Sequence, residues 1–205
     1  MMREGLAQLI NHEPDLVTSG EADTAGQALN AISARRPDLV LVDLSLPDKS
    51  GLELIKDIQV FHPGLATLVF SMHEESIYAE RVLRAGGRGY IMKQEGGKRL
   101  MHAIRQVLGG GIYVSEKISA KILEIFSGHK VDAAQSPIEL LTDRELEIYQ
   151  MVGEGKTSRD IASQLHLSVK TIEVHRANIK RKLNLRNSAE LVRSAVRWLE
   201  TRPAG

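Results

Sequence analysis

Residues 39–51 read LVLVDLSLPDKSG, and this stretch decides the fold of the first half of the chain. Its four consecutive aliphatic residues predict a short strand buried on both faces, as strands of parallel sheets usually are. Asp43 closes the run, and the proline and glycine that follow are typical of a loop. When helices cover both faces of a parallel sheet, ligands bind beyond the carboxyl ends of its strands. Asp43 is therefore predicted to lie at a functional position.

Short apolar runs alternate with helical patterns on both sides of this stretch. Further strands are predicted at residues 66–71 (ATLVFS) and 89–92 (GYIM), and residues 15–22 (DLVTSGEA) can form another. Apolar residues at helical spacing predict helices at residues 3–10, 24–36, 51–61, 76–86 and 96–108, the second of them capped by Thr24. This alternation predicts an α/β domain with a doubly wound parallel sheet.

The pattern changes after the glycines at residues 109–111. Residues 115–126 predict one more helix, and residues 127–139 have the polar, small-residue composition of a linker. From residue 141 onward no strand pattern occurs, and helices are predicted at residues 143–155, 158–165, 170–183 and 188–200. Thr142, Thr157 and Ser168 are placed to cap the first three of these helices. The chain is thus predicted to hold an α/β domain followed by an all-α domain.

The composition, with 42% hydrophobic and 26% charged residues, is that of a globular protein. Because the chain has no cysteine, it cannot form a disulfide, a thiolate zinc site or a catalytic thiol. No apolar run approaches the roughly 20 residues that a membrane-spanning helix needs, and the N-terminus does not resemble a signal peptide. We therefore expect a soluble, cytoplasmic protein without a membrane partner.

Three polar side chains stand at the ends of three predicted strands: Asp43, Ser71 and Lys93. In a doubly wound sheet these ends converge, so a carboxylate, a hydroxyl and an ammonium group would share one small site. A carboxylate can attack phosphorus, and the other two groups can bind the phosphoryl oxygens. Each residue also has a purely structural interpretation, as a helix cap, a strand-end hydroxyl or a solvated cation. Their joint occurrence at three strand ends favours the site.

These residues carry a resemblance to the receiver domains of two-component systems. It rests on Asp43 with the following LSLPDKSG, on Ser71 opening SMHEES, and on GYIMK ending in Lys93, within residues 3–110. The resemblance implies that a sensor histidine kinase phosphorylates Asp43, that Ser71 and Lys93 sense the phosphoryl group, and that Tyr90 is an aromatic switch. It implies Mg²⁺ as the cofactor, bound by the Asp43 carboxylate and the backbone carbonyl of Ser45.

One departure from this pattern concerns the start of the sequence. Receivers carry a pair of acidic residues after a first strand, and these acids hold the Mg²⁺, whereas this sequence opens in the first helix, MREGLAQLI. Two interpretations are open: the sequence is part of a longer reading frame, or the receiver is degenerate and binds metal weakly. In a flavodoxin-like sheet of order 2-1-3-4-5 the first strand is central, so we expect its absence to leave strand edges unpaired.

Residues 157–183 predict a helix-turn-helix, because two helices are joined by the short turn HLS. Ile172, Ile179 and Leu183 mark the inward face of the second helix, which in this geometry enters the major groove of DNA. Residues 141–185 are similar, nearly position by position, to the DNA-binding domain of the LuxR type, and the match extends over about residues 138–200. A solvated amphipathic helix is the alternative that the charge content of the outer face leaves open.

The resemblance to the LuxR type implies which residues contact DNA. Lys170, Thr171, His175 and Lys180, with Thr157 at a helix N-terminus, would contact phosphates, whereas Glu173, Val174 and Ala177, with Arg176 beside them, would face the groove. Cations and helix N-termini bind phosphate without reading sequence. A carboxylate can accept a hydrogen bond from cytosine N4, and an aliphatic side chain can contact a thymine methyl group.

A receiver joined to such a domain is typical of NarL/FixJ response regulators, in which the last helix, here residues 188–200, pairs two DNA-binding domains. The predicted fold is a flavodoxin-like α/β domain that lacks its first strand, followed by an all-α four-helix domain. The predicted boundaries are a receiver at 1–110, a helical linker at 111–137 and a DNA-binding domain at 138–205. The implied partners are double-stranded DNA, a sensor histidine kinase, a second copy of the chain and RNA polymerase, and no enzymatic activity is expected.

Three other functions stay open. A phosphorylation-independent transcription factor would use a degenerate receiver for dimerisation or ligand binding. A haloacid-dehalogenase-like phosphotransferase also uses a strand-end aspartate, but its D-x-D pattern needs an acid where this chain has Ser45. A protein-interaction adaptor would lack the salt-dependent affinity for DNA that a recognition helix provides.

Overall fold

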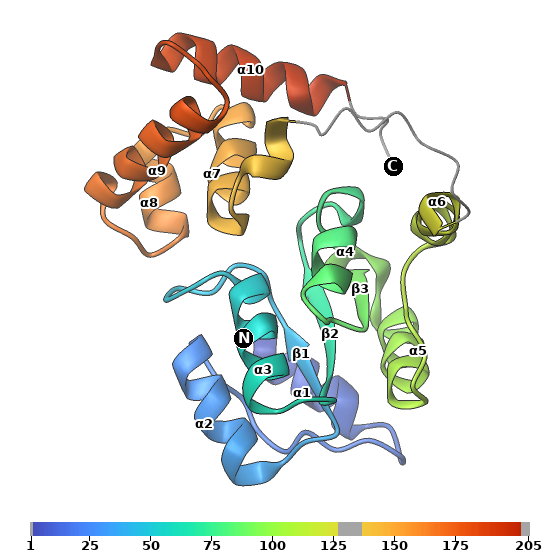
Figure 1. Ribbon diagram of the computed structural model, residues 1–205. Helices are drawn as coiled ribbons and strands as arrows, with labels where there is room; N and C mark the ends of the chain where they lie inside the picture. Colours follow the sequence, from blue (N-terminus) through green and yellow to red (C-terminus); the bar gives the residue numbers. More distant parts are fainter. Residues whose placement is uncertain (1, 127–136, 202–205) are drawn as a thin grey trace. The chain divides into compact units, whose positions relative to one another are not determined.

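The computed structural model describes residues 2–126 and 137–201 of the chain. The chain divides into two compact units, Met1–His129 and Lys130–Gly205 (Figure 1). The described residues of the first unit form strands and helices, and those of the second form helices only, so the predicted fold classes are confirmed. Among the described helices, none is both long enough and apolar enough to cross a membrane.

The first unit is built on a three-stranded parallel sheet of order β1-β2-β3. The strands β1 (Leu39–Val42), β2 (Ala66–Ser71) and β3 (Gly89–Met92) occupy three of the predicted segments. Val42 lies opposite Val69, and Ser71 lies opposite Met92. Because the strands are parallel, their carboxyl ends lie at the same end of the sheet, and the residues that follow them meet there.

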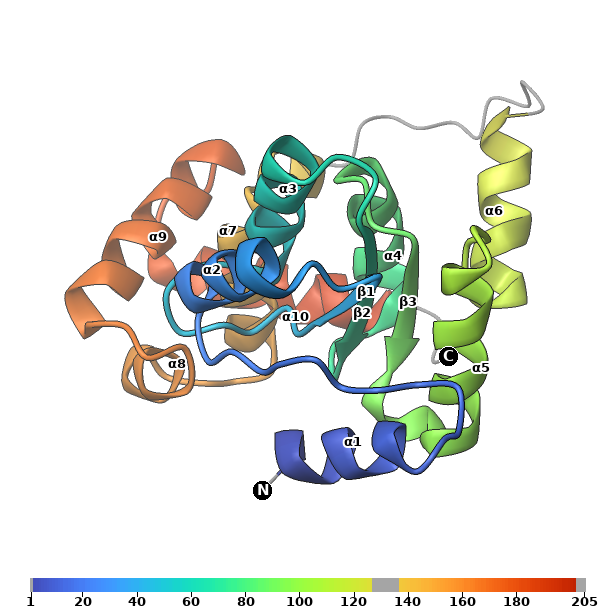
Figure 2. The same cartoon turned by 90° about the horizontal axis from the view of Figure 1, so that it is seen from below.

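One face of the sheet is covered by α5 (Gly97–Leu108), whose apolar side packs on Leu68 and Ile91. The first helix, α1 (Met2–Asn11), contributes Leu6 to the same cluster. Figure 2 shows α3 on the opposite side of the sheet from α5. The sheet therefore has helices on both faces, as a doubly wound fold requires.

The remaining helices of the first unit are α2 (Ala25–Arg35), α3 (Gly51–Phe61) and α4 (Glu75–Arg84). α2 packs beside α3, and α4 packs along β3. Thr24 caps α2 as predicted, because its hydroxyl accepts a hydrogen bond from the Gln27 N–H. Asp48, in the loop after β1, accepts hydrogen bonds from the N–H groups of the first two residues of α2, at 3.0 and 3.2 Å. The loop that follows Asp43 is thus bound to a second helix.

Residues 15–22, which the apolar pattern assigned to a strand, do not form one. A strand needs a neighbour for its backbone N–H and C=O groups, and none of the described strands pairs with this segment. Val17 within it is 81% exposed. The segment is anchored instead at Asp15, whose carboxylate accepts two hydrogen bonds from the Arg105 guanidinium of α5, at 2.8 and 2.7 Å. The strand prediction was wrong because β-propensity without a pairing partner does not make a sheet.

The burial of β1 also differs from its prediction. Val42 is buried, but Leu39, Val40 and Leu41 are only half-buried. The reason is that, among the described residues, β1 pairs with β2 alone and is therefore an edge strand. An apolar pattern typical of a central strand stands at the edge of this sheet.

The opposite edge of the sheet is covered. Tyr113 forms a parallel bridge with Gly89, in which its N–H donates to the Arg88 carbonyl at 3.0 Å and its carbonyl accepts from the Tyr90 N–H at 2.8 Å. The next helix, α6 (Glu116–Phe126), occupies the predicted segment and packs near α4. The chain that leaves the sheet is therefore itself hydrogen-bonded to β3.

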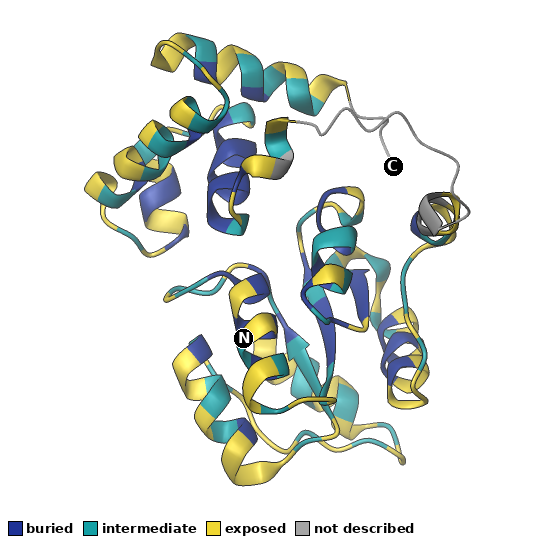
Figure 3. Ribbon diagram, viewed as in Figure 1, coloured by how far each residue is buried: buried dark blue, intermediate teal, exposed yellow. Residues whose placement is uncertain are grey.

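The second unit consists, in its described part, of a 3₁₀ turn at Pro137–Leu140 followed by α7 (Asp143–Gly153), α8 (Ser158–Gln164), α9 (Val169–Lys182) and α10 (Ser188–Glu200). α7 packs against both α9 and α10 and is buried along most of its length (Figure 3). Thr142, Thr157 and Ser168 each accept a hydrogen bond from the backbone N–H three residues on, so the predicted caps are confirmed.

Polar contacts connect α7 to α9 and to α10. The Lys182 ammonium of α9 donates to the Glu145 carboxylate at 2.6 Å. Burial raises the pKa of Glu145, but the bonds from Lys182 and Thr142 outweigh it and lower the pKa below its ordinary value of 4.5. Toward α10, the Tyr149 hydroxyl forms a hydrogen bond with the Ser194 hydroxyl at 2.8 Å, and the centre of the Tyr149 ring lies 5.3 Å from that of the Trp198 ring.

The substitution Gly51→Ala should destabilise the first unit by about 1–3 kcal/mol, the usual effect of overpacking. A Cβ at Gly51 would collide with the backbone carbonyl oxygen of Asp43. Gly26→Ala is the matched control, because Gly26 also lies in the first turn of a helix and a Cβ there would meet nothing within 4 Å. Urea unfolding followed by circular dichroism measures both variants. Equal unfolding midpoints would contradict the packing argument.

Because its folded pKa is depressed, ionised Glu145 contributes stability at neutral pH, and this contribution is lost as the pH falls below about 4.5 and through the folded pKa. Glu145→Gln should therefore destabilise the second unit at neutral pH and weaken its loss of stability in acid. Trp198, the only tryptophan, reports this unit by its fluorescence. The control is Glu200→Gln, at the end of α10. An unchanged acid transition in Glu145→Gln would show that another group controls it.

Candidate functional site

Asp43 and Lys93 meet at the carboxyl end of the sheet. The Lys93 Nζ donates a hydrogen bond to Asp43 Oδ2 at 2.6 Å. The lysine side chain is 12% exposed and the aspartate side chain 33% exposed, so solvent reaches the carboxylate more freely than the ammonium. The ammonium also lies 5.8 Å from the ring centre of Phe70 on β2. The pair joins the ends of two strands that are not neighbours, β1 and β3.

Ser71 and Tyr90 lie on the strands beside this pair. Ser71 ends β2, is fully buried, and accepts a hydrogen bond from the His73 N–H at 3.3 Å. Tyr90 on β3 is 1% exposed, and its hydroxyl donates to the His73 carbonyl at 2.7 Å. Burial raises the pKa of Tyr90, so its hydroxyl keeps its proton at neutral pH. The structure therefore holds the Tyr90 ring inward and ties it to the loop that follows Ser71.

One contact at this site was not predicted from the sequence. The Ser45 hydroxyl lies 2.9 Å from His73 Nε2, so the loops after β1 and β2 are joined by a hydrogen bond beside Asp43. The His73 ring also lies 5.1 Å from that of Tyr78. No sequence signal points to this pair, because a single histidine in a polar loop has no spacing pattern.

The residues around Asp43 do not fit a magnesium site. Mg²⁺ requires near-octahedral oxygen coordination, in proteins usually from one or two carboxylates with water. Within the described part of the chain no cluster of three histidine, aspartate or glutamate side chains could hold a metal. The Asp43 carboxylate is bonded to Lys93 and to the Ser45 N–H, and the nearby Asp48 caps α2. The side chains described here do not by themselves form the implied magnesium site.

The second unit presents a helix-turn-helix formed by α8 and α9. His166 in the turn has a left-handed backbone with φ of 53°, and the Leu167 N–H closes the turn on the Ala162 carbonyl at 2.9 Å. Ile172 and Ile179 of α9 are fully buried, as predicted for the inward face, whereas Leu183, also predicted there, is the C-cap of the helix and only half-buried. This packing fixes which side of α9 faces outward.

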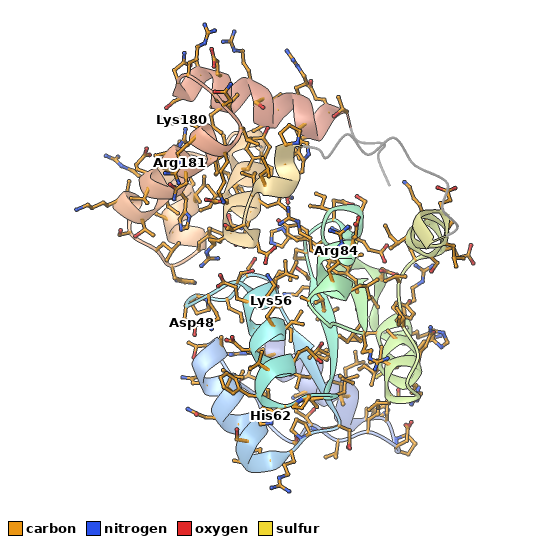
Figure 4. The ribbon with its side chains drawn as sticks, viewed as in Figure 1. Asp48, Lys56, His62, Arg84, Lys180 and Arg181 are labelled. Atoms are coloured by element: carbon orange, nitrogen blue, oxygen red, sulfur yellow. The ribbon has the colours of Figure 1, made fainter. Side chains whose placement is uncertain are left out.

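The residues predicted to contact DNA differ in exposure, and all but Thr157, the N-cap of α8, lie on α9. Thr157, Lys170, Glu173, Val174 and Ala177 are exposed, and Thr171, His175, Arg176 and Lys180 are half-buried. Figure 4 shows Lys180 and Arg181 on the second half of α9. Neither Lys170 nor Lys180 forms an ion pair with any described residue, so both cations are available to an anionic partner. Val174 is 55% exposed, so its side chain is accessible to a partner.

Ser158, the first residue of α8, also belongs to this surface, although no sequence pattern indicates it. Its hydroxyl contacts both Glu173 and Arg176 of α9. A serine in the first turn of a helix is common for reasons of capping alone, and for that reason it carries no functional signal.

Comparison with known families matches both units. Residues 1–105 match the response regulator receiver domain, and residues 139–195 match the bacterial regulatory proteins of the luxR family. The two matches lie in the same order as the two units of the structure.

Curated relatives align with nearly the whole chain. The oxygen regulatory protein NreC of Staphylococcus haemolyticus is 33% identical over 96% of this chain and 93% of its own length. The transcriptional regulatory protein UhpA of Escherichia coli is 35% identical over 94% of this chain and 91% of its own length.

Solved structures show the same architecture. A two-component response regulator of the LuxR family from Aurantimonas sp. SI85-9A1 superposes with a TM-score of 0.56 at 32% identity, covering 62% of this chain and 90% of that one. The RcsB response regulator of Salmonella typhimurium gives a TM-score of 0.62 at 22% identity, with 96% and 92% covered, and supports the fold alone. The chain therefore belongs to the response regulators that join a receiver domain to a LuxR-family regulatory domain.

Proposed function

We propose that a sensor histidine kinase transfers a phosphoryl group to Asp43, and that this modification controls the binding of residues 138–205 to double-stranded DNA as a homodimer. The observation that carries the proposal is the contact between Lys93 and Asp43 at the carboxyl end of the sheet. This contact places an ammonium group beside a partly exposed carboxylate, the arrangement that an acyl phosphate needs.

The chemistry follows from the groups at the site. An oxygen of Asp43 attacks the phosphorus of phosphohistidine, the N–P bond breaks, and an acyl phosphate forms on the carboxylate. The Lys93 ammonium, held by its bond to Oδ2, is positioned to offset the added negative charge. The Ser71 hydroxyl, which accepts a hydrogen bond from the His73 N–H and also bonds with the Tyr90 hydroxyl, is the donor that can turn toward the phosphoryl oxygens.

Tyr90 offers a route from this site to the surface of the domain. The Tyr90 hydroxyl donates its hydrogen bond to the His73 carbonyl. When residues 71–73 shift toward the phosphoryl group, this carbonyl moves with them and the hydrogen bond of Tyr90 changes. β3 carries Tyr90 between α4 and the bridge at Tyr113. We infer that the surface formed by α4 and α5 responds to phosphorylation.

DNA binding is assigned to α8 and α9. Lys170, Thr171, His175, Lys180 and Thr157 contact phosphates, and Glu173, Val174, Ala177 and Arg176 face the base edges. The exposure of Lys170 and of Val174 supports this division, because phosphate contacts position a protein and groove contacts specify sequence.

The receiver occupies residues 1–110, a helical linker residues 111–137 and the DNA-binding domain residues 138–205. A cytoplasmic location, a contact with RNA polymerase and the absence of an enzymatic activity of its own go with a transcription regulator of this kind.

Asp43→Asn should abolish phosphorylation while leaving the fold intact, because the two side chains have the same shape. The full chain is incubated with phosphoramidate, whose N–P bond resembles that of phosphohistidine, and its intact mass is measured. The mass of the unsubstituted chain should increase by one phosphoryl group, and hydroxylamine should remove this group. Asp38→Asn, which changes an exposed aspartate before β1, should keep the gain. Failure of the unsubstituted chain to gain mass would favour a phosphorylation-independent regulator.

Lys170→Ala should weaken binding to any duplex DNA and lower the slope of log K against log salt concentration by about 1, because one phosphate contact is lost. Fluorescence anisotropy with a duplex of arbitrary sequence measures both quantities at several salt concentrations. Lys98→Ala removes the same charge from α5 in the first unit and should leave the slope unchanged. Equal slopes for the two variants would contradict the assignment of Lys170.

A further inference from the structure

The hydroxyl of Ser158 joins two side chains of α9, the helix proposed to enter the major groove. Ser158 Oγ donates a hydrogen bond to Glu173 Oε1 at 2.5 Å and accepts one from Arg176 Nη1 at 3.3 Å. Ser158 is the first residue of α8, whereas Glu173 and Arg176 lie three residues apart on α9. The two α9 side chains form no direct ion pair with each other among the described residues, so the serine hydroxyl is the atom that links them.

The hydroxyl is not needed to cap its own helix. Thr157 is the N-cap of α8 and forms a reciprocal capping box with Asp160. Both hydrogen bonds of the Ser158 hydroxyl run to the neighbouring helix instead. Its position is fixed by the cap beside it, and it can therefore act as a fixed point for the longer and more flexible side chains of α9.

The two contacts of Ser158 occupy one carboxylate oxygen of Glu173 and one guanidinium nitrogen of Arg176. A hydroxyl has one hydrogen to donate, and here Glu173 Oε1 takes it. The second glutamate oxygen and the other N–H groups of the Arg176 guanidinium have no bond to Ser158. A carboxylate accepts from cytosine N4, and a guanidinium donates to guanine O6 and N7, so these remaining atoms match the two bases of one kind of pair.

Flexible side chains on an exposed helix lose rotamer freedom when they bind a base. A side chain that is already held loses less, so its preference for the correct base is expressed more fully. We propose that Ser158 is a positioning residue that orients Glu173 and Arg176 to read G·C pairs in the major groove. The inference rests on the proposed DNA binding and concerns its sequence specificity.

The test compares five variants of the full chain: Ser158→Ala, Ser158→Thr, Ser163→Ala, Glu173→Ala and the double variant Ser158→Ala with Glu173→Ala. Ser163 is an exposed serine in the same helix and serves as the matched control. Each protein selects from a pool of duplexes with a randomised core of about 20 base pairs, long enough for two half-sites, and the bound fraction is sequenced. Affinity for an unselected duplex and its salt dependence are measured in parallel. Trp198 fluorescence confirms that each variant is folded.

Ser158→Ala should lose about tenfold of its preference for G·C at one position of each half-site, while affinity for the unselected duplex and its salt slope stay the same. Ser158→Thr keeps a hydroxyl and should restore the preference, and Ser163→Ala should not change it. Glu173→Ala should lose the same preference, and adding Ser158→Ala to it should lose no more, because the two act as one unit.

Selection of the same sequence with the same strength by Ser158→Ala would overturn the inference while DNA binding stands. Weaker binding of Ser158→Ala to all duplexes alike would also overturn it, because that result assigns Ser158 to the helix fold or to phosphate binding. If the unsubstituted chain binds no duplex at all, the proposed function itself fails, and the inference fails with it.

Discussion

The parallel pairing of β2 with both β1 and β3 is the constraint on which the first unit depends. It brings Asp43 and Lys93, fifty positions apart in the chain, within hydrogen-bonding distance, although neither strand touches the other. The loop that carries Asp43 is then held from several sides. Gly51 packs without a side chain against the Asp43 carbonyl, and Asp48 binds the start of α2. A site held in this way needs little rearrangement when charge is added to it.

Most of this fold could be predicted from the sequence because its signals are local. The run LVLV, the loop after it and the caps Thr24, Thr142 and Ser168 all report on residues within one helical turn or one strand. Residues 15–22 show where such reasoning ends. Their composition favours a strand, but a strand also needs a neighbour, and pairing is decided by the whole sheet. The half-burial of β1 has the same origin.

The same distinction between local signals and contacts across the chain applies to the candidate site. The strand-end positions of Asp43, Ser71 and Lys93 follow from the alternation of strands and helices, and the outer face of α9 follows from its apolar spacing. The contacts of Ser45 with His73 and of Ser158 with Glu173 and Arg176 join segments that are separated in the chain. Single serines and histidines in polar surroundings carry no periodicity, so only the three-dimensional structure could reveal these contacts.

The two edges of the sheet differ, and this difference sets the order in which its backbone amides open to solvent. Tyr113 covers β3, and β2 lies between two strands, whereas β1 has a pairing partner on one side only among the described residues. Amide protons of β1 that point away from β2 have no partner strand to protect them, and they exchange through small local fluctuations. Those of β2 exchange only when the sheet itself separates. The strand that carries Asp43 at its end is thus the first to loosen, and the strand that carries Ser71 is the last.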